Sequence, residues 1–142
     1  QKEQLMITII TNTEALKMRI ETKNFNPDID VKLLCTCGHA ECDKRSVHQG
    51  VLNRLQKLRE QVGRPLTVTS GGRCPNHPNE THRKKPADHQ KCVGIDIAIR
   101  GGVERSELVR LGTECGFNAI GAAKTFVHLG WRCNEPPIMW VY

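Results

Sequence analysis

The chain has 142 residues, a formal net charge of +6 and an aromatic content of only 4%. This length suits one domain around a single core, and the absence of any apolar run of about 18 residues argues against a transmembrane helix. The positive charge favours anionic partners, which include nucleic acid, an anionic membrane surface and an anionic cell-wall polymer.

The first half of the chain predicts a strand, a helix and a second strand. Residues 5–11 have the composition of an edge strand. Ser46 is a suitable N-cap for a helix that runs through Gln61, and Gly63 lies where such a helix would end. A short strand is then expected over residues 66–69. The apolar residues of the helix recur at helical spacing at Val47, Val51, Leu55 and Leu58.

The second half of the chain predicts three strands and one further helix. In chain order, the expected elements are a polar loop over residues 71–92, a strand over 93–99, a helix over 103–115 with Gly116 as its C-cap, strands over 118–121 and 125–131, and a tail over 135–142. The tail is apolar enough to pack back on the domain or to form an interface strand. We therefore predict an α+β domain with a small, mostly antiparallel sheet flanked by helices and a metal cleft walled by loops.

Two histidines and one aspartate stand out as a candidate metal site. His89 and Asp96 lie seven residues apart, and His128 follows in an apolar strand. Strand alternation places Asp96 opposite Ile95 and Ile97, on a face of small residues where a cleft would lie. Two imidazoles and a carboxylate form a common zinc ligand set that keeps a fourth position for water. The pattern therefore predicts a hydrolytic zinc site.

Four landmarks occur in order along the chain: "TSGGRC" (Thr69–Cys74), His89, Asp96 and "FVHLGWR" (Phe126–Arg132). They resemble the zinc D-alanyl-D-alanine carboxypeptidase family. Its superfamily also includes phage L-alanyl-D-glutamate endolysins, murein endopeptidases and the N-terminal Hedgehog domain. The resemblance extends upstream through "KNF" (Lys23–Phe25) and residues 51–74, so it covers roughly residues 22–133.

The resemblance implies roles for individual residues. Arg73 is expected to hold a substrate carboxylate or carbonyl, or to stabilise the oxyanion. We expect a single domain, with the peptidase-like core over residues 22–133, an N-terminal extension over 1–21 and a tail over 134–142. The residues that carry over as zinc ligands are His89, Asp96 and His128.

The resemblance does not supply a general base. Relatives commonly have a catalytic acid three residues before the last histidine or an aspartate two residues after it, where this chain has Thr125 and Gly130. A peptidase needs a group that takes a proton from water and delivers it to the leaving amine. The candidates in the polar loop are Asp88 and Glu80, with His82 between them. Asp88 is alternatively an orienting group for a ligand imidazole, and both acids are alternatively solvated loop charges.

Seven cysteines are the second unusual feature: Cys35, Cys37, Cys42, Cys74, Cys92, Cys115 and Cys133. The first three form the segment "CTCGHAEC", which resembles a metal knuckle without standard finger spacing. Three interpretations stay open. The three thiolates bind a second, structural zinc together with His39 or His48; the cysteines form disulfides in an oxidising compartment; or they are ordinary free thiols.

The leading functional hypothesis is a zinc peptidase that hydrolyses peptidoglycan stem or cross-bridge peptides, as a D-Ala-D-Ala carboxypeptidase or an endolysin-like enzyme. Gly94 and Ala98 are small enough, beside the metal, to suit an alanyl side chain. The alternative is a non-catalytic zinc-containing module that binds cell wall or a partner and has lost the general base. A nucleic-acid binder is disfavoured, because no helix concentrates Lys and Arg with aromatic partners.

The expected partners are peptidoglycan peptides. No cleavable signal is evident, because the apolar run "LMITII" is short and Glu3 precedes it. This favours a phage virion protein, or a protein of the host cytoplasm that acts on the cell wall. The oligomeric state is left open.

Overall fold

The computed structural model describes residues 20–142, and the predicted strand over residues 5–11 lies outside them. A mixed sheet of five strands forms the centre of the domain, in the order β1-β2-β4-β3-β5. The first three neighbour pairs are antiparallel, whereas β5 joins β3 in parallel. The α+β prediction with a mostly antiparallel sheet is confirmed. The strands are β1 (Val68–Ser70), β2 (Gly94–Ala98), β3 (Ala119–Ala122), β4 (Phe126–Gly130) and β5 (Ile138–Val141).

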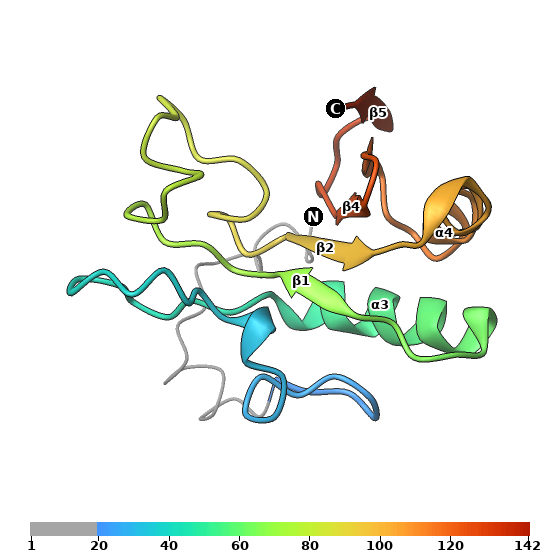
Figure 1. Cartoon of the computed structure of the whole chain (residues 1–142), viewed down its shortest axis with the longest axis horizontal. Helices are drawn as coiled ribbons and strands as arrows, with labels where there is room; N and C mark the ends of the chain where they lie inside the picture. The colour runs from blue at the N-terminus through green and yellow to red at the C-terminus, as the bar shows by residue number, and fades with distance from the viewer. Residues whose placement is uncertain (1–19) are drawn as a thin grey trace.

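Two α-helices and a short 3-10 helix accompany the sheet (Figure 1). They are η1 (Val31–Leu33), α3 (Gln49–Val62) and α4 (Gly101–Glu114). In Figure 1, α3 runs beneath β1 and β2, and the loop between β1 and β2 projects away from both helices. The α3 residues Val51, Leu52, Leu55 and Leu58 share one core with the strand residues Ile95, Ile97, Val127 and Leu129. The helices therefore cover the apolar face of the sheet.

The opposite face of the central strands carries polar and small residues. In the β2–β4 ladder, Asp96 lies directly opposite His128, and Gly94 lies opposite Gly130. Because side chains alternate along a strand, these four residues share the face that Ile95 and its core neighbours do not use. The predicted alternation is confirmed, and it brings Asp96 and His128 together across one ladder rung.

Helix α3 begins two residues later than a Ser46 cap predicts. The N-cap is His48, whose Nδ1 accepts a hydrogen bond from the Gly50 N–H at 3.1 Å. The His48 N–H is tied to the Cys92 carbonyl at 2.8 Å, which fixes where the helix starts. Ser46 is buried, and its hydroxyl has no hydrogen-bond partner within residues 20–142. The predicted stop at Gly63 is confirmed, with φ +76°.

The end of helix α4 also differs by one residue from the prediction. Cys115 is its C-cap, and Gly116 follows it at φ +101°. A left-handed glycine is still required at this turn, but one position beyond the cap.

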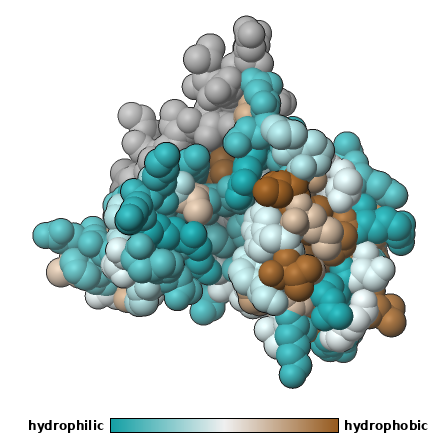
Figure 2. All heavy atoms as spheres, turned by 90° about the horizontal axis from the view of Figure 1, so that it is seen from above, coloured by the Kyte–Doolittle hydropathy of each residue, from teal (hydrophilic) through white to brown (hydrophobic). Residues whose placement is uncertain are grey.

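The tail packs back on the domain as β5, which resolves the alternative left open by its composition. Figure 2 looks onto the end of the molecule where Figure 1 places β5, and it shows a group of hydrophobic side chains within a hydrophilic surface. Ile138, Met139 and Val141 of this strand are exposed. Among residues 20–142, no helix has the length and apolarity to cross a bilayer.

Candidate active site

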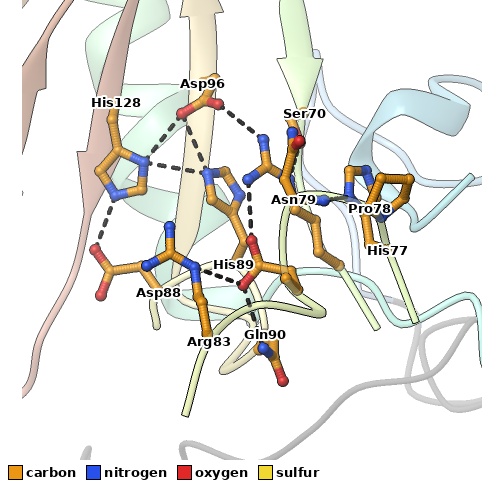
Figure 3. Close-up of polar contacts among 12 residues, drawn as sticks. Ser70, His77, Pro78, Asn79, Arg83, Asp88, His89, Gln90, Asp96 and His128 are labelled. Carbon is orange, nitrogen blue, oxygen red and sulfur yellow. Dashed lines mark hydrogen bonds and ion pairs between the residues drawn. The ribbon is translucent and has the colours of Figure 1, made fainter. Parts of the chain in front are cut away.

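His89, Asp96 and His128 meet on the polar face of the sheet (Figure 3). His89 comes from the loop before β2, Asp96 from β2 and His128 from β4. The Asp96 Oδ1 lies 3.2 Å from the His89 Nε2 and 3.0 Å from the His128 Nδ1, and the two nitrogens are 3.2 Å apart. All three side chains are buried. Their ligand atoms are close enough to hold one metal ion.

Each imidazole is oriented through its other ring nitrogen. The His89 Nδ1 lies 2.7 Å from the Gly71 carbonyl oxygen, which can only accept a hydrogen bond. His89 therefore donates from Nδ1 and presents Nε2 to the metal position. The Arg73 N–H in turn donates to the His89 carbonyl at 3.0 Å, so the segment after β1 holds this residue from two sides.

Asp88 plays the matching part for His128. Its Oδ2 lies 2.8 Å from the His128 Nε2, and its Oδ1 accepts from the Arg132 Nε at 2.8 Å. The His128 ring is thereby oriented with Nδ1 toward Asp96. Such carboxylate–histidine pairs fix the tautomer and orientation of metal-binding imidazoles. The carboxylate of Asp88 is thus engaged on both oxygens.

Two paired glycines make room for the Asp88 carboxylate. A Cβ at Gly130 would lie 2.4 Å from the Asp88 Oδ2. A Cβ at Gly94 would lie 2.7 Å from the Asp88 Cβ and 2.8 Å from the His128 Cε1. Gly94 is therefore covered by these side chains and does not offer the open space for an alanyl group that its size suggested.

Arg73 and Glu80 form a second buried ion pair beside the first cluster. The Arg73 Nη1 lies 3.2 Å from the Glu80 Oε2, its Nη2 lies 3.4 Å from the Asp96 Oδ2, and its Nε donates to the Ser70 hydroxyl at 2.9 Å. The Glu80 side chain is only 1% exposed. Its other oxygen accepts from Gln90 and faces Arg83. Glu80 is thus held in a salt-bridge network, and it is no solvated loop charge.

An open pocket of about 450 Å³ gives solvent access to these groups. Its walls bring together cations from three parts of the chain, Arg73, Arg83 and Arg132, with aromatic rings from β4 and the tail. His82 also lines it and is exposed. The Trp140 ring lies 5.3 Å from the His128 ring and 5.5 Å from the Arg132 guanidinium carbon. The pocket is therefore basic and partly aromatic above a buried pair of imidazoles.

The polar contacts set the charge of the cluster. Burial alone would raise the pKa of Asp96, but the adjacent imidazoles of His128 and His89 hold that pKa below its usual range. Burial likewise opposes the ionisation of Asp88, yet His128 and Arg132 keep its pKa low. Burial would lower the pKa of His128, and the two aspartates raise it. Both carboxylates are therefore ionised, which is the form that metal binding requires.

The donor set fits a zinc ion. Two imidazole nitrogens and one carboxylate oxygen converge, each imidazole is oriented by a hydrogen bond, and the pocket leaves a side open for water and substrate. Other divalent metals accept the same ligands, and the ligand chemistry favours zinc among them.

Sequence reasoning missed several contributors to this site. Arg132 lies in the landmark "FVHLGWR", but its contact with Asp88 depends on the fold. Trp140 reaches the pocket only because β5 pairs with β3. The Gly71 carbonyl carries no side-chain signal, although the glycine pair in "TSGGRC" marks a close approach: a Cβ at Gly71 would lie 2.5 Å from the Leu33 oxygen.

Comparison with known proteins agrees with this geometry. No curated protein matches the chain significantly. A family model described as peptidase M15 matches residues 23–130. The matched range includes every residue of the His89, Asp96 and His128 cluster and ends at Gly130, the last residue of β4. The chain therefore belongs to the peptidase M15 family, the superfamily of zinc D-Ala-D-Ala carboxypeptidases and endolysin-type peptidases.

Proposed function

We propose that this protein is a zinc-dependent peptidase that hydrolyses peptidoglycan stem or cross-bridge peptides. The observation that carries the proposal is the convergence of His89 Nε2, Asp96 Oδ1 and His128 Nδ1 at the floor of an open, basic pocket. Membership of the M15 family supports a metallopeptidase in general terms. The chemistry that bound zinc supplies is Lewis acidity toward the scissile carbonyl and an acidified water.

The basic rim favours a peptide that carries a carboxylate close to the scissile bond. Arg83 and Arg132 both line the pocket, and the Arg132 side chain is 29% exposed. Guanidinium groups bind carboxylates in a bidentate manner. Stem peptides offer such a group at a free C-terminus, as a carboxypeptidase requires, or on a glutamyl residue, as an L-alanyl-D-glutamate endopeptidase requires.

Arg73 has two roles in this proposal. Its contact with Asp96 holds that carboxylate in place, and its position in the pocket wall lets it approach a substrate carbonyl or oxyanion. Because its side chain is only 12% exposed and already binds Glu80, the orienting role is the stronger of the two.

The geometry favours orienting roles for both acids that the sequence offered as bases. Asp88 is engaged by His128 and Arg132, and Glu80 by Arg73, Arg83 and Gln90. Of the three loop candidates, His82 is the exposed group in the pocket wall. We therefore assign to His82 the role of taking a proton from water and delivering it to the leaving amine.

A non-catalytic module is the second candidate function. The observation that favours it is that, within residues 20–142, the pocket holds no carboxylate free of a partner. Asp88 and Asp96, the acids in its wall, are both hydrogen-bonded. Such a module would bind the same peptides and leave them intact.

Mass spectrometry of purified peptidoglycan fragments distinguishes the two candidates. The fragments are incubated with zinc-loaded protein, with chelator-treated protein and with the His128→Ala variant. New fragments that require both the metal and His128 establish the peptidase and identify the bond. Intact fragments, from protein with one equivalent of metal in the pocket, would contradict the peptidase and favour the module. A His82→Ala variant that retains full turnover would remove His82 from the mechanism.

A further inference from the structure

Four cysteines meet at a second place in the fold, away from the pocket. Three come from the loop before α3, Cys35, Cys37 and Cys42, and the fourth is Cys74, just after β1. One sulfur from each lies within 4.8 Å of the others. Cys35 and Cys74 are buried, whereas Cys37 and Cys42 are partly exposed. The loop therefore brings three thiols next to the thiol of Cys74, which lies 32 residues after Cys42 in the sequence (74 − 42).

The spacing of these sulfurs suits a tetrahedral metal better than disulfides. The Cys37 and Cys74 sulfurs are 3.6 Å apart. A zinc–thiolate bond of about 2.3 Å places neighbouring sulfurs of a tetrahedron about 3.8 Å apart. A disulfide needs about 2.05 Å, and it would use the sulfurs in pairs rather than as a group of four. All seven cysteines are free thiols in the structure.

The two histidines that compete for the fourth position are used elsewhere. The His39 Nδ1 accepts from the Glu41 N–H at 3.0 Å within its own turn. The His48 Nδ1 caps helix α3, and its ring lies 5.8 Å from the Trp131 ring. Neither belongs to the cluster. The fourth ligand position falls to Cys74, which no sequence spacing had connected with the loop.

The local backbone is shaped as a metal knuckle. Gly38 follows Cys37 at φ +77°, a conformation that turns the chain directly after a ligand. The Lys44 N–H points at the Cys42 sulfur at 3.4 Å, a contact that suits a thiolate acceptor.

We propose that Cys35, Cys37, Cys42 and Cys74 bind a structural zinc ion as four thiolates. All four tetrahedral positions are then filled by protein, which is typical of structural zinc sites and leaves no place for substrate. The proposal is independent of whether the pocket is catalytic, because it concerns different ligands and a different part of the chain.

The site also secures the segment that supports the pocket. Arg73 directly precedes Cys74, and the Gly71 carbonyl orients His89. On its other side this segment contacts the chain just before and just after Cys35–Cys42: the Gly72 N–H donates to the Leu33 oxygen, and a Cβ at Gly72 would lie 2.1 Å from the Arg45 oxygen. Metal at the four thiolates joins the two segments, so its loss is expected to speed amide hydrogen exchange at Gly72 and Arg73.

Metal analysis with cobalt substitution tests the proposal. The full chain, purified under reducing conditions, is expected to bind about two equivalents of zinc. After removal of zinc, Co²⁺ is expected to produce intense thiolate-to-cobalt charge-transfer absorption. That absorption should persist in His128→Ala, in which the pocket ligands are broken, and disappear in Cys37→Ser with loss of about one equivalent. The matched controls are Cys133→Ser, a partly exposed cysteine outside the cluster, and His39→Ala, both of which should retain the absorption.

Several outcomes would overturn the four-thiolate site. They are wild-type protein without charge-transfer absorption, a Cys37→Ser variant with unchanged zinc content, iron in place of zinc in the purified chain, and disulfides among the four cysteines in a thiol titration of the denatured, metal-free chain. If Cys37→Ser does not fold, the spectra of the wild-type protein and of His128→Ala still decide. A failed peptidase assay leaves all of these measurements unaffected.

Discussion

The two ligand clusters of this protein differ in what holds them and in what reaches them. The His89, Asp96 and His128 cluster lies on the sheet, where a ladder rung sets Asp96 against His128, and it opens into a pocket. The four-cysteine cluster lies on loops and is filled by its own side chains. A rigid floor with an open side suits chemistry on a substrate, whereas a closed set of ligands suits the fastening of two segments.

The clusters also differ in their surroundings. Around the pocket cluster, Asp88 and the Gly71 carbonyl orient the imidazoles, and Arg132 in turn holds Asp88. Around the cysteines, backbone groups contact the Cys42 sulfur: the Lys44 N–H donates to it, and the thiol faces the Cys35 carbonyl. We therefore expect the geometry of the pocket cluster to depend on its supporting hydrogen bonds, and the geometry of the cysteine cluster to depend on its bound metal.

The largest expected effect follows from removing a pocket ligand. His128→Ala should reduce peptide hydrolysis to background and lower the zinc content by about one equivalent per chain, because two ligands hold a metal far more weakly than three. Turnover and metal content are measured on the same sample. His77→Ala, which loses the turn contact at Asn79 and lies outside the pocket wall, should retain both. Full activity in His128→Ala would show that the pocket cluster does not hold a catalytic metal.

Removing the support for His128 should have the next largest effect. Asp88→Asn keeps the size of the side chain but loses the charge that fixes the His128 tautomer, and we expect metal affinity or turnover to fall about 10–100-fold. Competition with a chelator measures the affinity. Asp28→Asn, at an exposed position, is the matched control. Asp88→Asn should leave the cobalt–thiolate absorption of the cysteine cluster unchanged.

A paired exchange tests whether Asp88 occupies the space that relatives give to an acid two residues after the last histidine. Gly130→Asp alone should be disruptive, because its Cβ would lie 2.4 Å from the Asp88 Oδ2. Asp88→Ala alone should lower the affinity for the metal. The double variant should recover part of the lost affinity, since the carboxylate introduced on β4 would reach the vacated space. If the loss of metal affinity in the double variant equals the product of the losses in the two single variants, the two positions do not share this role.

The smallest expected effect concerns the aromatic wall. Trp140→Ala should raise KM a few-fold, equivalent to about 0.5–1.5 kcal/mol, because the ring contacts His128 and Arg132 without binding the metal. Steady-state kinetics with a peptidoglycan fragment measure the change. Met139→Ala, on the same strand but outside the pocket wall, should leave KM unchanged.

Local rules account for most of the secondary structure and fail at particular contacts. The alternation in β2 and β4, and Gly63 at the end of α3, followed from period and turn chemistry. The start of α3 did not, because the hydrogen bond from His48 to the Cys92 carbonyl joins residues 44 positions apart (92 − 48). The position of the tail strand could not be predicted, because an apolar segment can pair with any free sheet edge and only the fold places the β3 edge beside it.

The candidate ligand set of the pocket could be predicted from the sequence, since His89, Asp96 and His128 occur in a recognisable order and two of them lie in strands with alternating apolar and polar residues. The contacts of Asp88, Glu80 and Cys74, in contrast, follow from the fold and could not be predicted from the sequence. Asp88 and Glu80 are acids in one polar loop, and each took its role from partners that other segments bring to it. Cys74 is read in sequence as a neighbour of Arg73, and only folding places its sulfur among three others. The kind of ligand that a residue offers is set by its side chain, whereas the set of ligands that meet at one site is set by long-range packing.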